Sequence, residues 1–483
     1  MSISITIVLL YCVVMVLIGL KYKNKQNSVS EFVTASHGLN YWVAALSARA
    51  TGESGWLILG LTGFGFLYGL SGLWIALGET LGVAISWMFI IPRFKDESEK
   101  YDSLTVLDYF EDKLDDRKHL VRIVLSSILL VMVIAYCAAQ LTATGKAFNS
   151  FYNMNIIVAE LLGLFIVLLY VSFGGFRAVA VSDLIQGALM FIGLVLVPIV
   201  GVIKAGGIRP IFEKVSTNAP EIFNIMPENN IMSENYTALA VGLMIIGFLA
   251  TGLGFLGSPQ IYQRIIALKR KEDIKKGRVV AITYTLITDT CAVLTGVIGR
   301  YYFVSLKDPE TVYPDLVQHL FGPLMIGVLI AVILSAIMST MDSLLILASS
   351  TIVRDFMQKI FGKATNEKTA VTCLRVSSVV IALAAFGLAA IKTQVIFEMV
   401  LFAWAGIASA FCPTLIMTLF WKGTNKYGVV IGAVGGFLTT LIWKFFWEDI
   451  MYEMFPGFVA GFVLIYLGSL ATKRFCKQSN GKC

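Results

Sequence analysis

Long apolar stretches separated by short polar segments fill most of the chain. A helix needs roughly 20 apolar residues to cross the hydrocarbon core of a bilayer, and about thirteen stretches meet this length. The predicted membrane helices are 3–20, 40–68, 72–92, 123–149, 155–174, 183–205, 237–262, 279–304, 320–352, 371–391, 396–421, 427–447 and 455–472. The pattern therefore predicts an all-α, multi-pass integral membrane protein.

The polar segments alternate in charge along the chain. Lys and Arg concentrate in residues 21–25, 93–122, 264–278, 354–368, 422–426 and 473–482 and at Arg177, whereas segments 206–236 and 305–319 carry few. Because basic loops remain on the cytoplasmic side, the N-terminus is predicted outside and the C-terminus inside the cytoplasmic (inner) membrane. The first stretch lacks a basic leader and a small-residue cleavage site, so it is predicted to be a retained helix.

The amino-acid composition agrees with a membrane protein and argues against several other classes of function. Hydrophobic residues make up 57% of the 483 residues and charged residues 14%, whereas soluble proteins carry about 25% charged residues. The net charge of +7 belongs to the cytoplasmic loops, so no nucleic-acid partner is expected, and no obligatory protein partner is predicted. The seven cysteines and three histidines show no metal-site spacing. Residues 96–119 are predicted to form a cytosolic loop with an amphipathic helix, and no soluble enzyme domain is expected.

Polar residues interrupt the second predicted helix at its centre. The stretch ALSARATGESGWLILG, residues 45–60, holds Arg49 and Glu53 among Gly, Ser and Thr. A charge at the bilayer centre costs at least about 2.5–3.5 kcal/mol. Unwound backbone is tolerated at this depth only where it lines a cavity or is buried in protein. The stretch therefore predicts the broken helix of a solute-binding site, and the chain is interpreted as a secondary transporter.

The seventh predicted helix contains a similar interruption. The triplet Ala-Thr-Gly of residues 50–52 recurs at 250–252, and Gly254, Gly257 and Pro259 follow. Two interrupted helices five spans apart are typical of a five-plus-five inverted repeat. The predicted organisation is a peripheral first helix (1–25), a first repeat (40–205), an external loop (206–236), a second repeat (237–421) and peripheral helices with a cytosolic tail (427–483).

The ninth predicted helix carries hydroxyl groups in the sequence ILSAIMSTMDSLLILASS. Ser339 and Ser343 are four residues apart, so they share one face with Ala336. Packed against unwound carbonyls near Ala50 and Glu53, this face would supply the oxygens that a hard cation such as Na⁺ requires. Alternatively, the hydroxyls only bond to their own backbone or to a neighbouring helix. The adjacent broken helix favours the ion site.

Charged residues inside the predicted helices leave two interpretations open. Arg49 and Glu53 are four residues apart and can neutralise each other, whereas Glu79 has no partner nearby in the sequence. They form a structural cluster, or they bind a charged solute group or carry a proton. Asp183 is either a favourable charge at a helix N-terminus or part of an ion exit path. Four other charged residues are expected at the membrane interface, near helix ends: Glu160, Asp289, Arg300 and Glu398.

Polar and aromatic side chains also lie near the two interruptions. Tyr136 and Gln140 share a helical face, and Gln140 is a candidate hydrogen-bonding partner for a polar solute. Trp56, Phe255 and Trp404 either pack the helices together or contact the solute.

Seven motifs together carry a family resemblance. They are ALSARATGESGWLILG, DSLTVLDYFEDK, AYCAAQL, SFGGFRAVAVSDLIQGALM, GLGFLGSPQI, AIMSTMDSLLILASS and FAWAGIASAFCP. The chain resembles the solute:sodium symporter family and, within it, the bacterial sodium/proline symporters. The resemblance implies a LeuT-like fold, a cytoplasmic membrane location and sodium-driven solute uptake by alternating access.

The resemblance also implies site residues. Sodium would bind the backbone carbonyls of Ala50, Glu53 and Ala336 and the hydroxyls of Ser339 and Thr340. Asp183, Asp342 and Ser343 would serve a second ion or the exit path. The candidate solute-binding residues are Thr51, Glu53, Ser54, Trp56, Glu79, Tyr136, Gln140, Thr251 and Phe255.

The chain departs from the proline-symporter pattern at several of these positions. An aspartate of that pattern is Gly52 here, and its Trp and Tyr on the seventh helix are Thr251 and Phe255. Gly52 has no side-chain ligand, so Glu53 or Asp342 is predicted to supply the missing charge. The resemblance therefore does not fix proline as the solute.

The favoured hypothesis is a Na⁺-coupled symporter for a small polar organic solute such as an amino acid. The alternatives are a proton-coupled transporter of a charged solute that uses Glu53 or Glu79, and a transporter-like sensor or channel. The sensor is disfavoured because no cytosolic signalling domain is expected before Cys483.

Overall fold

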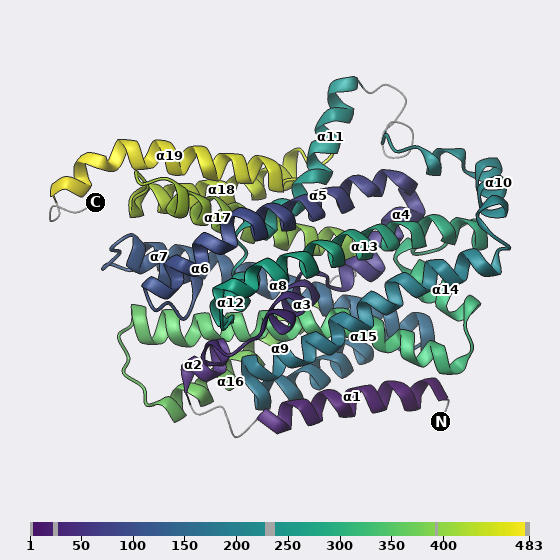
Figure 1. Ribbon diagram of the computed structural model, residues 1–483, viewed down its shortest axis with the longest axis horizontal. Helices are drawn as coiled ribbons and strands as arrows, with labels where there is room; N and C mark the ends of the chain where they lie inside the picture. Colours follow the sequence, from purple (N-terminus) through teal and green to yellow (C-terminus); the bar gives the residue numbers. More distant parts are fainter. Residues whose placement is uncertain (1–2, 23–27, 228–236, 392–394, 479–483) are drawn as a thin grey trace.

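Helices account for the regular elements of the described residues. The computed structural model describes residues 3–22, 28–227, 237–391 and 395–478. Figure 1 shows long helices lying side by side, with α1 at one flank and α18 and α19 at the other.

The α-helices are α1 (Ile3–Tyr22), α2 (Val29–Thr34), α3 (Tyr41–Gly52), α4 (Thr62–Tyr68), α5 (Leu73–Ile85), α6 (Ile91–Lys100), α7 (Val106–Lys113), α8 (Leu120–Tyr152), α9 (Ile156–Lys204), α10 (Ile208–Asn218), α11 (Ala238–Ala250), α12 (Pro259–Ala267), α13 (Ile274–Tyr302), α14 (Val312–Leu320), α15 (Pro323–Ser350), α16 (Glu367–Ile391), α17 (Ile396–Phe420), α18 (Lys426–Phe446) and α19 (Met454–Gln478). Short 3₁₀ or π segments join them, among them η3 (Trp56–Leu61), η7 (Thr251–Leu256) and η10 (Thr351–Ile360).

The described residues contain 11 helices long and apolar enough to cross a membrane. The predicted count of about thirteen is therefore not confirmed. One of the 11 runs from Trp56 to Lys100 and joins the end of the second predicted helix to the third, and the fifth is reduced to the shorter apolar helix Ile156–Val171. In the structure that helix belongs to α9, which bends at Gly175, where φ is +55°.

Both predicted helix interruptions are present. α3 ends at Gly52, and Glu53 leaves the helical region with φ −91° and ψ 84°. In the seventh helix, α11 passes into the 3₁₀ segment η7, Gly257 leaves the helical region with φ −172° and ψ 9°, and α12 begins with Pro259. Proline suits the first turn of a helix because its missing N–H would have no partner there.

α15 occupies the middle of the bundle. From Leu329 to Ser350 its residues are all buried, and it packs against α1, α3, α8, α9 and α16. A helix that is buried all round must have its hydroxyl groups satisfied inside the protein. This position makes α15 a supporting wall for the α3 interruption.

The segment predicted as external loop, 206–236, contains regular structure in its first half. The helix α10 and a 3₁₀ turn, Pro220–Phe223, fill much of it, and Ile211 and Val215 bury one face of α10. Residues 228–236 of this loop lie outside the described residues, as do Lys23 and Lys25 of the first basic segment. The apolar residues recur at helical spacing in this segment, so the helix could have been recognised from sequence.

The predicted cytosolic segment 96–119 is anchored by a buried ionic network. Asp108 pairs with Arg122 at 2.8 Å and with Arg354 at 3.0 Å, and it accepts a 3.1 Å hydrogen bond from the backbone N–H of Thr105. Burial raises the pKa of Asp108, but Arg354 and Arg122 outweigh burial, so its pKa lies below the ordinary value. Asp108 therefore stabilises the folded state above its unfolded-state pKa, and this contribution is lost as the pH falls through the folded-state pKa.

Replacement of Asp108 by Asn is expected to destabilise the protein by about 3 kcal/mol, because Arg354 loses its ion-pair partner and the buried Arg122 keeps only Glu111 and Asp355 of its three carboxylates. Thermal unfolding of the purified protein in detergent at pH 7 measures this loss. The difference between wild type and variant should shrink as the pH falls below the ordinary aspartate pKa. A variant as stable as wild type at pH 7 would contradict the assignment.

Candidate ion and solute site

The α3 interruption contacts the hydroxyl face of α15. The Ser339 hydroxyl donates to the Ala50 carbonyl at 2.9 Å and lies 3.2 Å from the Ala336 carbonyl. The Thr340 hydroxyl donates to the Thr51 carbonyl at 3.0 Å. All these residues are buried. The contact between the second and ninth predicted helices is therefore present, and hydroxyl and carbonyl oxygens meet there.

This arrangement fits the chemistry of a small hard cation. Carbonyl and hydroxyl oxygens are the ligands that such ions prefer. Each hydroxyl now donates to a carbonyl, and rotation about its C–O bond would turn a lone pair towards an ion instead. Thr340 meets the carbonyl of Thr51 and not that of Glu53. Of the predicted sodium-site residues, Ala50, Ala336, Ser339 and Thr340 are brought together.

Side chains of α8 replace the hydrogen bonds that the α3 interruption loses. The Gln140 amide oxygen accepts from the Gly55 N–H at 3.0 Å, and its amide nitrogen donates to the Ser54 hydroxyl at 3.2 Å. Tyr136 donates to the same hydroxyl at 3.5 Å. The face shared by Tyr136 and Gln140 therefore lies against the interruption and fixes its backbone.

Four aromatic rings surround a small cavity beside the interruption. Trp56, Tyr136, Phe255 and Trp404 line it together with Gly52, Glu79, Val400 and Leu401. The indole of Trp404 donates to the Thr251 carbonyl at 3.1 Å, and its ring centroid lies 5.2 Å from that of Phe255. The cavity of about 10 Å³ has room for about one water molecule.

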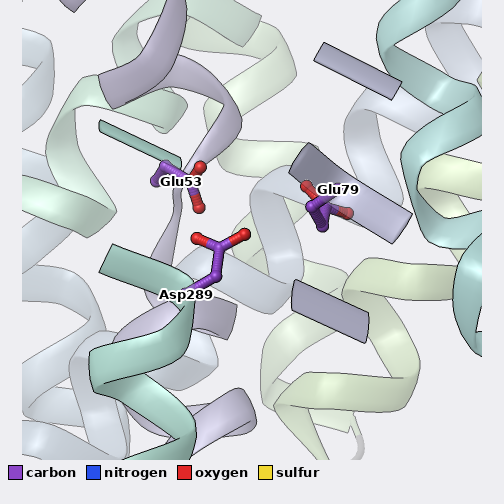
Figure 2. Close-up of side chains that lie close together, drawn as sticks. All are labelled: Glu53, Glu79 and Asp289. Atoms are coloured by element: carbon purple, nitrogen blue, oxygen red, sulfur yellow. The ribbon is translucent and has the colours of Figure 1, made fainter. Parts of the chain in front are cut away.

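Buried charged side chains gather next to this cavity. Arg49 forms an ion pair with Glu53, and its guanidinium carbon lies 4.5 Å from the centroid of the Phe255 ring. Ligand oxygens of Glu53, Glu79 and Asp289 all lie within 4.8 Å of one another. Figure 2 shows the three carboxylates around a common region, with Glu53 and Asp289 turned towards each other. The three residues come from the end of α3, from α5 and from α13.

The interfacial position predicted for Asp289 is wrong. Asp289 is fully buried near the middle of α13, and its neighbour Thr288 donates a 3.2 Å hydrogen bond to it. Its packing partners are on α3 and α5, far away in sequence, so its distance from Glu53 and Glu79 could not be read from the spacing of residues.

Glycines bring Glu79 to the seventh-helix interruption. A Cβ atom at Gly82 would lie 2.0 Å from the Gly252 carbonyl oxygen, and one at Gly252 would lie 1.9 Å from the Gly78 carbonyl oxygen. Only glycine permits so close an approach of two backbones. The crossing of α5 and η7 therefore places Glu79 beside Thr251.

Arg264 occupies the region where a second ion was predicted. Its guanidinium lies 3.1 Å from Asp183, contacts the Ser343 hydroxyl and is fully buried. Asp342 instead accepts a 2.6 Å hydrogen bond from Tyr170. Arg264 was predicted to begin a basic loop, but it lies on α12, inside the bundle. An arginine thus supplies the positive charge between Asp183 and Ser343.

A second, larger cavity has a volume of about 600 Å³, and its lining includes Thr251 and Leu401. Leu401 also lines the small cavity, so the two adjoin. Six of the lining residues are acidic and Lys444 is basic; the acidic ones are Asp308, Glu310, Glu398, Glu448, Asp449 and Glu453. Glu398 therefore lies on a cavity wall.

Comparison with known proteins identifies relatives over nearly the whole chain. The family model described as "Sodium:solute symporter family" matches residues 32–436. Curated relatives include the osmoregulated proline transporter OpuE of Bacillus subtilis, 34% identical over 99% of this chain and 97% of that protein. The high-affinity proline transporter PutP of the same organism is 34% identical over 95% and 96%. Sodium/proline symporter 2 of Staphylococcus saprophyticus is 33% identical over 97% and 92%.

Solved structures with the same fold are also transporters. A Na⁺-coupled sialic acid symporter in a substrate-bound outward-open state superposes with a TM-score of 0.81, at 19% identity over 98% of each chain. Mhp1, a nucleobase-cation-symport-1 family transporter, superposes with a TM-score of 0.56, at 14% identity over 94% of this chain and 96% of Mhp1. These likenesses and the two interrupted helices establish a LeuT-like fold. The chain belongs to the sodium:solute symporter family and is a symporter that uses Na⁺ as its coupling ion.

Proposed function

We propose that the protein imports a small polar organic solute of amino-acid size together with Na⁺. The contact of α3 with α15 carries this proposal. It gathers cation ligands at Ala50, Ser339 and Thr340, while Gly52, at the end of the same helix, lines the aromatic cavity. The ion and the solute would thus bind next to each other, on opposite sides of the C-terminal end of α3.

The candidate sodium ligands are the carbonyls of Ala50 and Ala336 and the hydroxyls of Ser339 and Thr340. The backbone of Glu53 completes the predicted set, and its side chain keeps Arg49 neutralised. Gly52 lacks a side-chain ligand. Glu53 follows it directly in the chain, whereas Asp342 lies on α15 and already accepts hydrogen bonds from Tyr170 and Ser343. Glu53 is therefore the better candidate for the acid that the proline-symporter pattern has one position earlier.

The solute would lie in the aromatic cavity and its continuation towards Thr251. The candidate residues there are Thr51, Glu53, Ser54, Trp56, Glu79, Tyr136, Gln140, Thr251 and Phe255. The names of the relatives support an amino-acid-sized solute, and proline is one member of that class.

The proposed orientation has the N-terminus outside and the C-terminus in the cytoplasm of a bacterial cell. The 600 Å³ cavity, which includes Asp308 and Glu310 of the predicted external segment 305–319, then opens to the outside. Movement of the proposed repeats, 40–205 and 237–421, against each other would close this cavity and open a cytoplasmic path. Family membership favours Na⁺ coupling over proton coupling, and transport over a sensor or channel function.

Uptake of a panel of radiolabelled amino acids into proteoliposomes tests the proposal. An inward Na⁺ gradient is expected to drive accumulation of at least one of these amino acids inside the proteoliposomes. Accumulation should be abolished when an equal K⁺ gradient replaces the Na⁺ gradient, or when a Na⁺ ionophore is added. Uptake that is independent of the Na⁺ gradient, or that follows a pH gradient alone, would contradict it.

A further inference from the structure

The buried carboxylates next to the solute cavity are incompletely neutralised. Among the described residues, the ion pair in this cluster is that of Arg49 with Glu53, which leaves Glu79 and Asp289 without a cation of their own. Both side chains are at most 1% exposed. Buried charges are usually paired or bound to a cation, because removal from water is costly.

Oxygen atoms in the cluster also lack hydrogen bonds. Glu79 Oε2, Asp289 Oδ2 and Glu53 Oε2 are buried and have no hydrogen-bond partner among the described residues. A buried acceptor without a donor is destabilising, and more so when it is charged. A ligand that brings both positive charge and N–H donors would satisfy these oxygens.

Arg49 neutralises one of the three carboxylates of the cluster. Its guanidinium pairs with Glu53 and lies over the Phe255 ring at 4.5 Å. The Arg49 Nε has no hydrogen-bond partner among the described residues, but one guanidinium against three carboxylates leaves an excess of negative charge in the cluster. The charge of the site favours a solute with net positive charge.

The shape and walls of the small cavity favour an ammonium group. Four aromatic rings line the cavity, and of its lining residues in the described part of the chain Glu79 alone is charged. Aromatic faces attract organic cations, whereas a bare Na⁺ ion needs an oxygen cage. An ammonium group is about the size of the single water molecule that this cavity admits.

The approach to the site carries the same sign of charge. The larger cavity presents six acidic side chains against Lys444, and Lys146 neutralises only part of this excess by pairing with Asp308 and Glu310. A cleft lined by one sign of charge concentrates ligands of the opposite sign. The entrance and the binding centre thus select for cations independently.

We propose that Glu79 and Asp289 bind an ammonium group of the transported solute, and that the solute is an organic cation such as a diamine or a basic amino acid. The inference rests on the proposed symport of a small solute and specifies its class. The rest of the solute would extend past Leu401 and Thr251 into the larger cavity.

The test combines a binding and a transport measurement on the purified full chain. Thermal unfolding in 100 mM NaCl is followed with 1,4-diaminobutane, L-lysine, L-proline or succinate, and the same compounds are tested for stimulation of ²²Na⁺ uptake into proteoliposomes. The variants are Glu79→Gln and Asp289→Asn. Glu160→Gln on α9 is the matched control, because Glu160 is also buried but lies against Gly145, away from the cavity.

We expect 1,4-diaminobutane or L-lysine to raise the unfolding temperature and to stimulate ²²Na⁺ uptake in wild type and Glu160→Gln. Glu79→Gln and Asp289→Asn should each weaken the apparent affinity for the organic cation at least tenfold. Both variants should still be stabilised by Na⁺ without solute, which would show that they remain folded.

Preference for L-proline, with affinity unchanged in both variants, would overturn the inference and leave the proposed symport intact. The inference would also be overturned if Glu79→Gln transported one Na⁺ fewer per solute molecule and its solute preference were unchanged. Cations that bind without stimulating ²²Na⁺ uptake would instead contradict the proposed symport.

Discussion

Replacement of Arg49 by Met is expected to destabilise the protein by about 3–5 kcal/mol, because it leaves the buried Glu53 without its ion-pair partner. The nearby carboxylates Glu79 and Asp289 add to the loss, since Arg49 is the one cation of the described cluster. Unfolding by heat and by SDS in detergent solution measures the effect.

The matched control is the double variant Arg49→Met, Glu53→Gln. It removes both charges of the pair, so it should recover most of the stability that the single variant loses. A single variant as stable as wild type, or a double variant less stable than the single one, would contradict a charged Arg49–Glu53 pair.

Replacement of Thr340 by Val is expected to weaken the apparent Na⁺ affinity of uptake about 10- to 100-fold, with a smaller effect on maximal rate. The substitution keeps the shape of the side chain and removes one oxygen beside the Thr51 carbonyl. An interaction with a charged group is worth about 1.5–3 kcal/mol, and each 1.4 kcal/mol is tenfold in affinity.

Thr295→Val serves as the matched control for Thr340→Val. Thr295 is also buried, but its hydroxyl returns to its own helix at the Cys291 carbonyl. The Na⁺ dependence of uptake should be unchanged in this variant. Equal Na⁺ dependence in Thr340→Val and Thr295→Val would remove Thr340 from the proposed ion site.

Local sequence patterns were sufficient to predict the helix interruptions, and together with the family resemblance they predicted the principal contact. Arg49 and Glu53 among Gly and Ser are costly in a lipid-exposed helix, and both are buried in the protein where α3 ends at Gly52. Ser339 shares a helical face with Ala336, and this face meets Ala50. These predictions succeed because helical spacing determines which side chains share a face.

The sequence did not reveal which charged residues meet across the bundle. Asp289 was assigned to the interface and Arg264 to a loop, yet both are buried beside acidic residues from distant segments. Their partners depend on how α5, α12 and α13 pack, and the glycine contacts between α5 and η7 set part of that packing. A buried charge without a nearby partner in sequence, such as Glu79, was the available signal that a second charged residue must come from another helix.

Equilibrium binding of ²²Na⁺ to the purified protein, without solute, tests the central role of the α3–α15 contact most directly. Saturable binding is expected in wild type and in Ser335→Ala, where the hydroxyl that is lost donates to the Ala331 carbonyl of its own helix. Binding should be lost or weakened at least tenfold in Ser339→Ala, because this hydroxyl meets the Ala50 carbonyl. Equal ²²Na⁺ affinity in Ser339→Ala and Ser335→Ala would contradict the account.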